Sequence, residues 1–545
     1  MNIFDWNNPD LYFLIAISVI NSVILCFLSY KFLQIIQLSS YKLNRYGVWL
    51  KDTKAKWVSR ITMLSFLSFA CMLVTNFLFN AFQDNKLFGY IGLVFYFTFA
   101  IMFTKTMYKI PQKTPLRLTK RMFRLYVLIF LLFLILNFTS LLLSLEYTMY
   151  LRVSVISLLP ITIPIVVPFA TLIITPFEKF VCYLYKKTCS KKIAKNPNLI
   201  KIGITGSYGK TSTKFYLKSF LEKKYKVCCP PSSFNTPMGI TKVVLNNLNE
   251  DDEILIVEMG AVKKGEIKEL CKMINPNHGI ITSIGEQHLD TFKSLDNILN
   301  TKYELAEALN KDAFCVFNCA NENTLKLYNK STLKNKIAVC GDKKSLLTAK
   351  DIVATENGLD FVICYNKKEY HTSTKILGEH NIQNILCSAG LALKMGVNIK
   401  QVLEVIENLQ SAEHRLELKK LDNNVLIIDD SFNSNIQGTA VALKTLKLFN
   451  DRRKIVVTPG LVELGKREKI ENIELGKRIA DVADIVILVN KNQSENIKQG
   501  LIESGFDDKN IYLQDSLFEV TNQFKTLLQS GDVVLLENDL PDNYR

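Results

Sequence analysis

Cysteine pairs with the spacing of a zinc site are missing from this sequence. Its 12 Cys are scattered: Cys228 and Cys229 are adjacent, Cys315 and Cys319 are four apart, and no C-x-x-C pair occurs. Zinc sites and disulfide frameworks use tighter or more regular spacing. We therefore interpret the cysteines as buried free thiols of a protein in a reducing compartment.

Acidic residues are scarce in the first 195 residues. This part holds 22 Lys and Arg against 6 Asp and Glu, whereas the remaining 350 residues hold 45 of each kind. The net charge of +16 therefore belongs entirely to the N-terminal part. Because that part is also very apolar, the charge indicates membrane topology rather than nucleic-acid binding. The sequence contains no recognisable RNA- or DNA-binding module, so we expect no nucleic-acid partner.

Charged residues are also rare inside five long apolar stretches of this part, so we find no transport path. Each stretch is close to the ~20 residues needed to cross the hydrocarbon of a bilayer. The residues before the first one contain no Lys or Arg, which argues against a cleaved signal peptide. Three prolines in the fifth predict a kink or partial insertion. The stretches are residues 11–33, 61–83, 87–104, 125–145 and 153–175.

The loops between these stretches alternate in charge. Lys and Arg gather in residues 42–56, 109–124 and 186–195, whereas the opposite loops at 84–86 and 146–152 are short and nearly neutral. The positive-inside rule then predicts a multi-pass protein of a plasma membrane with five spans. Its N-terminus would lie outside and its last 350 residues in the cytoplasm.

The segment GITGSYGKTSTK, residues 203–214, resembles a phosphate-binding loop but lacks one glycine of the usual pattern. G-x-x-x-x-G-K-[ST] requires Gly where this chain has Ile204. The context still fits, because a predicted strand (199–205) precedes the loop and a predicted helix (210–224) follows it. Backbone N–H groups at such a helix start bind anions. An ordinary turn between strand and helix is the alternative interpretation.

Three further residues stand in or next to predicted strands and helices downstream. Glu258 ends a predicted strand at 252–258, where a carboxylate is well placed to hold Mg²⁺. His288 follows a predicted strand that begins near residue 277, and Lys302 lies in a predicted helix at 299–309. Taken singly, a strand-end carboxylate, a lone histidine and a helix lysine are more often structural than functional.

Together these segments resemble the Mur ligases, the ATP-dependent amide ligases of bacterial cell-wall synthesis. Gly206 to Ser212 matches the loop G-x-x-G-K-[TS]-[TS] of that family, in which the first Gly stands three residues before the second. Six more segments resemble family motifs in the same order, and the resemblance covers about 196–545. They are VEMGA (257–261), IGEQHLD (284–290), TKYEL (301–305), LGEHNIQNILCSAGLAL (377–393), AEHRLEL (412–418) and IIDDSFNSN (427–435).

The resemblance implies ATP and Mg²⁺ as cofactors and a role for each matched residue. Lys210, Lys302 and His288 would be catalytic. One Mg²⁺ would be held by Thr211 and Glu258, and a second by His288 and a carbamylated Lys302. Carbamylation needs a neutral amine, so Lys302 should have a depressed pKa. The implied ATP-binding residues are Gly206, Ser207, Tyr208, Gly209, Lys210, Thr211 and Ser212 at the phosphates, His380, Asn381 and Asn384 at the adenine, Arg415 at the γ-phosphate, and Asp430 at the ribose or the domain hinge.

The implied fold class is an α-helical membrane region followed by two α/β domains. The membrane region is residues 1–195, a P-loop central domain occupies 196–411, and a Rossmann-like C-terminal domain occupies 412–545. Its strands would include NVLIIDD, KIVVTPG, DIVILVN and VVLLEN. In the family, a small soluble N-terminal domain binds the UDP-sugar. Here membrane stretches stand in its place.

The implied activity is ATP-dependent, ADP-forming amide ligation through an acyl phosphate. IIDDSFNSN and residues 458–489 resemble the branch that adds D-alanyl-D-alanine to UDP-N-acetylmuramoyl tripeptide in peptidoglycan synthesis. The expected partners are those two substrates, the lipid bilayer and cell-wall synthesis proteins at the membrane. Two alternatives stay open: the same chemistry on a lipid-linked or polyglutamate-type acceptor, and a catalytically degenerate membrane scaffold.

Overall fold

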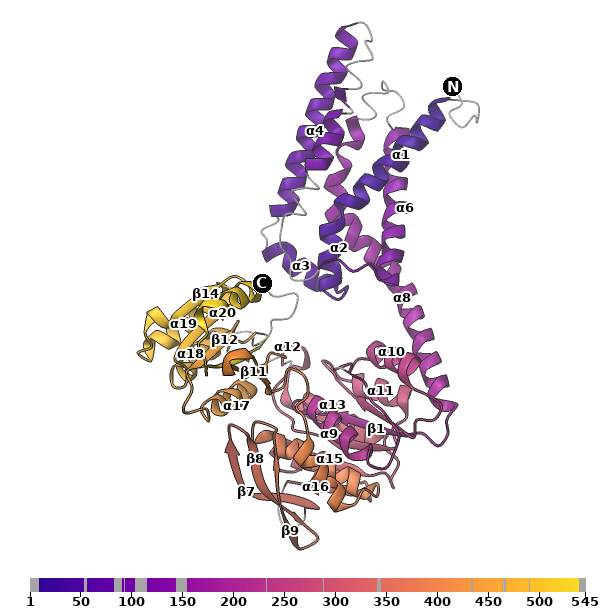
Figure 1. The fold of residues 1–545 in the computed structure, drawn as a ribbon. Helices are drawn as coiled ribbons and strands as arrows, with labels where there is room; N and C mark the ends of the chain where they lie inside the picture. Colours follow the sequence, from indigo (N-terminus) through magenta and orange to yellow (C-terminus); the bar gives the residue numbers. More distant parts are fainter. Residues whose placement is uncertain are drawn as a thin grey trace. The chain divides into compact units, whose positions relative to one another are not determined.

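The computed structural model forms two compact units that divide between Cys182 and Tyr183, and each is described here by itself. A thin grey trace in Figure 1 marks the segments outside the description. The described residues are 9–52, 56–82, 91–92, 94–102, 115–143, 154–231, 233–287, 289–340, 345–432, 435–462, 464, 467–489 and 491–538.

The first unit is built from helices (Figure 1). Three helical segments are long and apolar enough to cross a membrane: Val58–Leu78, Lys120–Leu142 and Ser154–Ala194. The bent pair α1–α2 would make a fourth if it is one span. The elements are α1 (Pro9–Leu28), α2 (Tyr30–Leu38), α3 (Leu43–Asp52), α4 (Lys56–Ala81), α6 (Lys120–Leu143), the 3₁₀ helix η1 (Leu159–Thr162) and α8 (Ile163–Ala194).

The first predicted stretch, residues 11–33, is not one straight helix. The chain bends by 46° between α1 and α2, and α2 continues to Leu38. Ser29 stands at the break, and its hydroxyl donates to the carbonyl of Leu25 at 2.7 Å. A serine that bonds back to the preceding turn often bends a helix. The apolar pattern does not reveal such a bend, because a single serine hardly changes the hydropathy of the stretch.

Part of the predicted topology lies outside the described residues. Of the stretch 87–104, residues 91–92 and 94–102 are described, and they are helical. The nearly neutral loops 84–86 and 146–152 are not described. In the fifth stretch, Pro160 lies in the 3₁₀ helix η1, whereas Pro168 lies inside the continuous helix α8. The predicted kink or partial insertion stays a prediction. α8 then runs on to Ala194, far beyond residue 175, because its last turns pack in the second unit. There Cys189 and Ile193 join the core, and the Ser190 hydroxyl donates to the Met273 carbonyl at 2.9 Å.

A nine-stranded sheet organises the first half of the second unit. Its order is β2-β3-β1-β4-β5-β6-β7-β8-β9, with β2 to β7 parallel and β7-β8-β9 antiparallel. Along β3, buried side chains alternate between two apolar cores, one on each face of the sheet. The strands are β1 (Ile200–Thr205), β2 (Val227–Cys228), β3 (Ile254–Glu258), β4 (His278–Ile281), β5 (Cys315–Asn318), β6 (Lys336–Val339), β7 (Leu347–Thr355), β8 (Gly358–Tyr365) and β9 (Lys368–Thr374).

Helices cover this sheet and follow the predicted positions. Strands 199–205 and 252–258 and helices 210–224 and 299–309 correspond to β1, β3, α9 and α13, so these predictions are confirmed. The helices are α9 (Lys210–Leu221), α10 (Pro237–Asn247), α11 (Glu266–Ile274), α12 (Leu289–Phe292), α13 (Leu295–Ala308), α14 (Glu322–Lys330), α15 (His380–Lys394) and α16 (Ile399–Asn408).

A six-stranded sheet organises the rest of the unit. Its order is β10-β11-β15-β12-β13-β14, parallel except for β10. The four predicted strands are all present in it. The elements are β10 (Glu417–Lys420), β11 (Leu426–Asp430), α17 (Ile436–Leu446), β12 (Lys454–Thr458), α18 (Glu468–Ala480), β13 (Ile485–Val489), α19 (Lys491–Glu503), β14 (Ile511–Gln514), α20 (Leu517–Leu527) and β15 (Val533–Glu537). The predicted α/β character of both halves is therefore confirmed.

Candidate active site

The ends of three neighbouring parallel strands bring the predicted site together. β1 lies between β3 and β4, so the loop after β1, Glu258 at the end of β3 and Thr282 after β4 meet at one edge of the sheet. Parallel sheets bind their ligands at this carboxyl edge. The predicted loop is thus in the place where a nucleotide phosphate would be held.

Two glycines give the loop its shape. Gly206 has φ +152° and Gly209 has φ +76°, backbone angles that other residues adopt with strain. Space is short as well: a Cβ on Gly206 would lie 1.9 Å from the Thr282 hydroxyl oxygen. A Cβ on Gly209 would lie 2.2 Å from Oδ1 of Asn384. The glycine spacing of the motif is therefore a packing requirement of this loop.

The loop's own hydrogen bonds determine which N–H groups point to a ligand. The N–H groups of Ser207 and Tyr208 both donate to the Ser283 carbonyl, at 2.9 and 3.1 Å. The start of α9, from Lys210 to the buried Ser212, has no predecessor turn to bond to, so its N–H groups form the anion-binding end of the helix. Lys210 folds back and donates to the Ser207 carbonyl at 2.8 Å.

Glu258 is the centre of a buried polar cluster. Its carboxylate accepts from the Thr211 hydroxyl at 2.9 Å and from the Asn235 amide at 3.1 Å. The ammonium of the fully buried Lys214 lies 4.0 Å from the same carboxylate. Thr211 and Glu258 thus offer hard oxygen donors side by side, which is the chemistry that Mg²⁺ prefers. Lys214 and Asn235 were missed from the sequence.

Two lysines of the site have lowered pKa values. Burial lowers the pKa of Lys210 to about 8, while the Glu258 carboxylate opposes this shift and Arg415 adds to it. Burial also lowers the pKa of Lys302 to about 7, and the nearby positive charge of Lys210 contributes. The Lys302 side chain is buried on α13. A lowered pKa is the direction that carbamylation requires, and burial is its largest cause.

The remaining predicted residues lie in different places. Asn384 is buried and accepts from the Thr213 hydroxyl at 3.4 Å, beside Gly209. Asn381 instead donates to the Leu377 carbonyl and accepts from Asn384, so it holds Asn384 in place. Tyr208 donates its hydroxyl to the Glu286 carbonyl at 3.1 Å. His288 lies outside the described residues.

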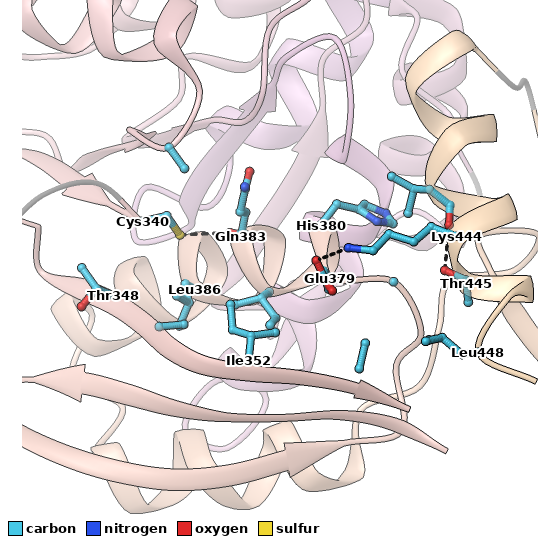
Figure 2. A pocket seen from close by; sticks show the side chains of 16 residues that line it. Cys340, Thr348, Ile352, Glu379, His380, Gln383, Leu386, Lys444, Thr445 and Leu448 are labelled. Atoms are coloured by element: carbon cyan, nitrogen blue, oxygen red, sulfur yellow. Dashed lines mark hydrogen bonds and ion pairs between the residues drawn. The ribbon is translucent and has the colours of Figure 1, made fainter. Parts of the chain in front are cut away.

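His380 borders a separate cavity of about 420 Å³ between α15 and α17 (Figure 2). Figure 2 shows Glu379 paired with Lys444 at its edge, at 2.9 Å. Asn381 and Asn384 do not line this cavity. The predicted adenine-contact residues are therefore split between the phosphate loop and the cavity, a division that a linear motif does not reveal.

Arg415 stands just before β10, and Asp430 is the last residue of β11; the two lie close together. Arg415 donates to the Phe432 carbonyl at 2.8 Å and stacks on the Phe432 ring. Asp430 accepts from the backbone N–H of Leu416 at 3.2 Å, and burial raises its pKa to about 6 despite the Arg415 charge. Asp430 thus orders the turn that carries Arg415.

A second group of metal-type ligands occurs nearby but is already neutralised. His414, Glu417 and Asp429 place ligand atoms within 4.8 Å of one another. The Lys419 ammonium lies 2.7 Å from Asp429 and 3.0 Å from Glu417. We therefore interpret this group as an ion-pair network.

Comparisons with known proteins agree with this geometry. Residues 204–392 match the model of the Mur ligase middle domain, and residues 414–537 match that of the Mur ligase glutamate ligase domain. Together the two matches cover more than half of the chain. The chain belongs to the Mur ligase family. The predicted family and its enzyme class, ATP-dependent and ADP-forming ligases that use Mg²⁺, are thereby confirmed.

Individual relatives of this Mur ligase share one name, UDP-N-acetylmuramoyl-tripeptide--D-alanyl-D-alanine ligase. The Haemophilus influenzae protein is 28% identical over 339 residues, 62% of this chain and 72% of its own length. The Bacillus subtilis protein is 30% identical over 280 residues, 51% of this chain and 60% of its own. The chain thus spans between about three fifths and three quarters of such relatives.

Solved structures show the same fold. MurF ligase from Thermotoga maritima in complex with ADP has a TM-score of 0.57 and 25% identity, covering 66% of this chain and 80% of that one. MurF from Acinetobacter baumannii has a TM-score of 0.58 at 21% identity, covering 67% and 78%.

Proposed function

We propose that this chain is a membrane-anchored ligase that joins D-alanyl-D-alanine to UDP-N-acetylmuramoyl tripeptide with hydrolysis of ATP to ADP. The observation that supports it most is that Lys210, the Thr211–Glu258 pair and the buried Lys302 lie close together at one edge of the sheet. The shared name of its relatives supports the choice of substrates.

The residues would act mainly by positioning and by neutralising charge. The start of α9 and Lys210 would hold the ATP phosphates while a substrate carboxylate oxygen attacks the γ-phosphorus, which forms an acyl phosphate and releases ADP. The amine of the dipeptide then attacks the acyl carbon, and phosphate leaves as the amide forms. Mg²⁺ held by Thr211 and Glu258 would screen the phosphate charge.

Phosphate release by the detergent-purified full chain tests this proposal. With ATP, Mg²⁺, UDP-N-acetylmuramoyl tripeptide and D-alanyl-D-alanine together, we expect turnover and a product heavier by one dipeptide. Omitting either substrate should abolish turnover. Turnover with D-alanine in place of the dipeptide, or none at all, would contradict the proposed amine substrate.

The same chemistry on a lipid-linked acceptor is a second candidate. It is favoured by the first 203 residues, which lie outside both family models and contain apolar helices. Turnover only with a lipid-linked tripeptide would select this candidate over the nucleotide-linked one. Polyglutamate extension would appear as turnover with glutamate, and a scaffold would retain cellular function after Lys210→Ala.

Membrane insertion with a cytoplasmic active site is part of the proposal. Its support is the apolar length of the helical segments and the placement of Lys and Arg in alternate loops. At the membrane, the protein would also contact other cell-wall synthesis proteins. In intact cells, a cysteine placed at the N-terminus should react with a membrane-impermeant maleimide, whereas one placed on exposed Lys368 should not.

A further inference from the structure

The start of α6 carries a concentration of positive charge, which we call the basic cluster: Arg117, Lys120, Arg121 and Arg124. No Asp or Glu occurs anywhere between residues 85 and 145. Cations at the N-terminus of a helix oppose its dipole, which favours negative charge there. The cluster is therefore placed where an anion is needed.

Glu178 of α8 supplies one negative charge, which forms an ion pair with Arg124. Arg124 binds this buried carboxylate with two hydrogen bonds, from Nε at 2.6 Å and from Nη2 at 2.9 Å. Such a bidentate pair is the strong form of the arginine–carboxylate contact. One carboxylate cannot neutralise the four cations of the cluster.

Arg121 is next to this pair without being hydrogen-bonded to it. Its Nε lies 3.9 Å from Glu178, and that atom makes no hydrogen bond within the described residues. The guanidinium stacks 3.6 Å above the Tyr41 ring, and 35% of the side chain is exposed. Arg121 is thus held in position beside a carboxylate that Arg124 already binds, and about a third of its side chain is exposed.

The backbone that carries the cluster is also held in place. The Arg117 N–H donates to Oε1 of Gln37 at 2.9 Å, and Nε2 of Gln37 donates to the Arg117 carbonyl at 2.8 Å. The Leu116 N–H contacts the Tyr30 hydroxyl at 3.4 Å. Both partners belong to α2, so the cluster has a preset geometry.

An exposed apolar stripe begins beside the cluster and runs along α6. Phe123, Val127, Leu131 and Ile135 are all exposed and stand four residues apart, which places them on one face of the helix. A ligand that matches both features carries an anionic group at one end and a hydrocarbon tail. Basic pockets at helix ends on the cytoplasmic side bind phospholipid head groups in this way.

We propose that the basic cluster binds the phosphate of an anionic membrane phospholipid whose acyl chain lies on the Phe123–Ile135 stripe. The inference rests on the membrane insertion proposed above, but it does not depend on the ligase substrates. It assigns the helical unit a specific lipid site in addition to anchoring.

Titration of the full-length protein in detergent with fluorescent phosphatidylglycerol or phosphatidylcholine tests the site. We expect tighter binding of phosphatidylglycerol, and an Arg121→Gln variant should weaken it about tenfold, as the loss of a charge-assisted hydrogen bond does. Lys51→Gln on α3 is the matched control: it removes the same charge from an exposed position, where salt screens its effect, so we expect a change within about twofold. Inorganic phosphate should not compete at comparable concentration, because it lacks the tail.

Each outcome decides one point. Equal losses of phosphatidylglycerol affinity in the two variants would mean diffuse charge attraction and would overturn the site. Equal affinity of the wild-type protein for the two lipids would overturn it as well. Competition by inorganic phosphate would assign the site to a soluble phosphate ligand instead. Unchanged melting temperature in detergent shows that Arg121→Gln folds. Release of the wild-type protein from membranes by alkaline carbonate would instead contradict membrane insertion itself.

Discussion

Buried polar groups are used differently in the two units of this protein. In the helical unit, Asn21, Ser22 and Asn137 hydrogen-bond to one another, so their polar atoms are largely satisfied within the protein. In the α/β unit, Lys210 and Lys302 bring like charges close together near Glu258. Like charges are costly to gather, and a bound polyanion relieves that cost. The first pattern stabilises packing, and the second prepares a ligand site.

Removal of Lys210 should give the largest effect and sharpen this contrast. Lys210→Ala should lower kcat/KM for ATP-dependent ligation by about 10²- to 10³-fold, the loss typical of one preorganised charge donor. Stability should be unchanged or slightly higher, because a partly buried cation is removed. Phosphate release and thermal unfolding measure the two quantities. Lys218→Ala, at a half-buried position of the same helix, is the control and should leave both unchanged.

The pH dependence of activity should report on Lys302. Its pKa is lowered to about 7, and the protonated amine below that value cannot be carbamylated. Activity should therefore be present above about pH 7 and fall about tenfold for each pH unit below it. Added bicarbonate should restore part of the lost rate. A profile that stays flat from about pH 6 to 8, or Lys302→Ala with full activity, would contradict a carbamylated lysine.

The phosphate loop offers a smaller and more selective test. Gly209→Ala adds a Cβ that would lie 2.2 Å from Oδ1 of Asn384, at φ +76°. The left-handed angle costs about 1–2 kcal/mol, and the clash displaces the loop as well, so ATP affinity should fall about tenfold or more. Gly265→Ala is the matched control: its φ is +90° with nothing within 4 Å, so it has the backbone strain without the clash. Equal ATP affinity in both variants would contradict a role for the clash.

The same two units explain what could be predicted from the sequence. Lys210, Thr211 and Glu258 were predicted because a strand, a glycine turn and a helix start are local patterns. Lys214 and Asn235 were missed because their contact with Glu258 joins segments that are distant in sequence. Periodicity treats Lys214 as one more polar position of a helix, although it is fully buried.

In the helical unit, apolar length predicted helices but not their ends. The break at Ser29 depends on a single hydroxyl bond. The extension of α8 depends on Cys189 and Ile193, two apolar residues in an otherwise polar segment. They can be recognised as the buried face of a helix only when the core that they join is known. Both differences arise from tertiary contacts, which no window of hydropathy contains.

The smallest expected effect tests the other side of the comparison, the self-contained polar group of the helical unit. Asn137→Leu removes the acceptor of Asn21 and the donor to Ser22 between α6 and α1. Such bonds between apolar helices contribute about 1 kcal/mol, because the separated helices also find partners. Detergent melting should fall by about 2–4 °C with unchanged kcat. Thr139→Val is the control, since its exposed hydroxyl bonds to carbonyls of its own helix, those of Ile135 and Leu136. A loss of kcat in Asn137→Leu would show that this polar group serves the reaction, and the contrast between the two units would then fail.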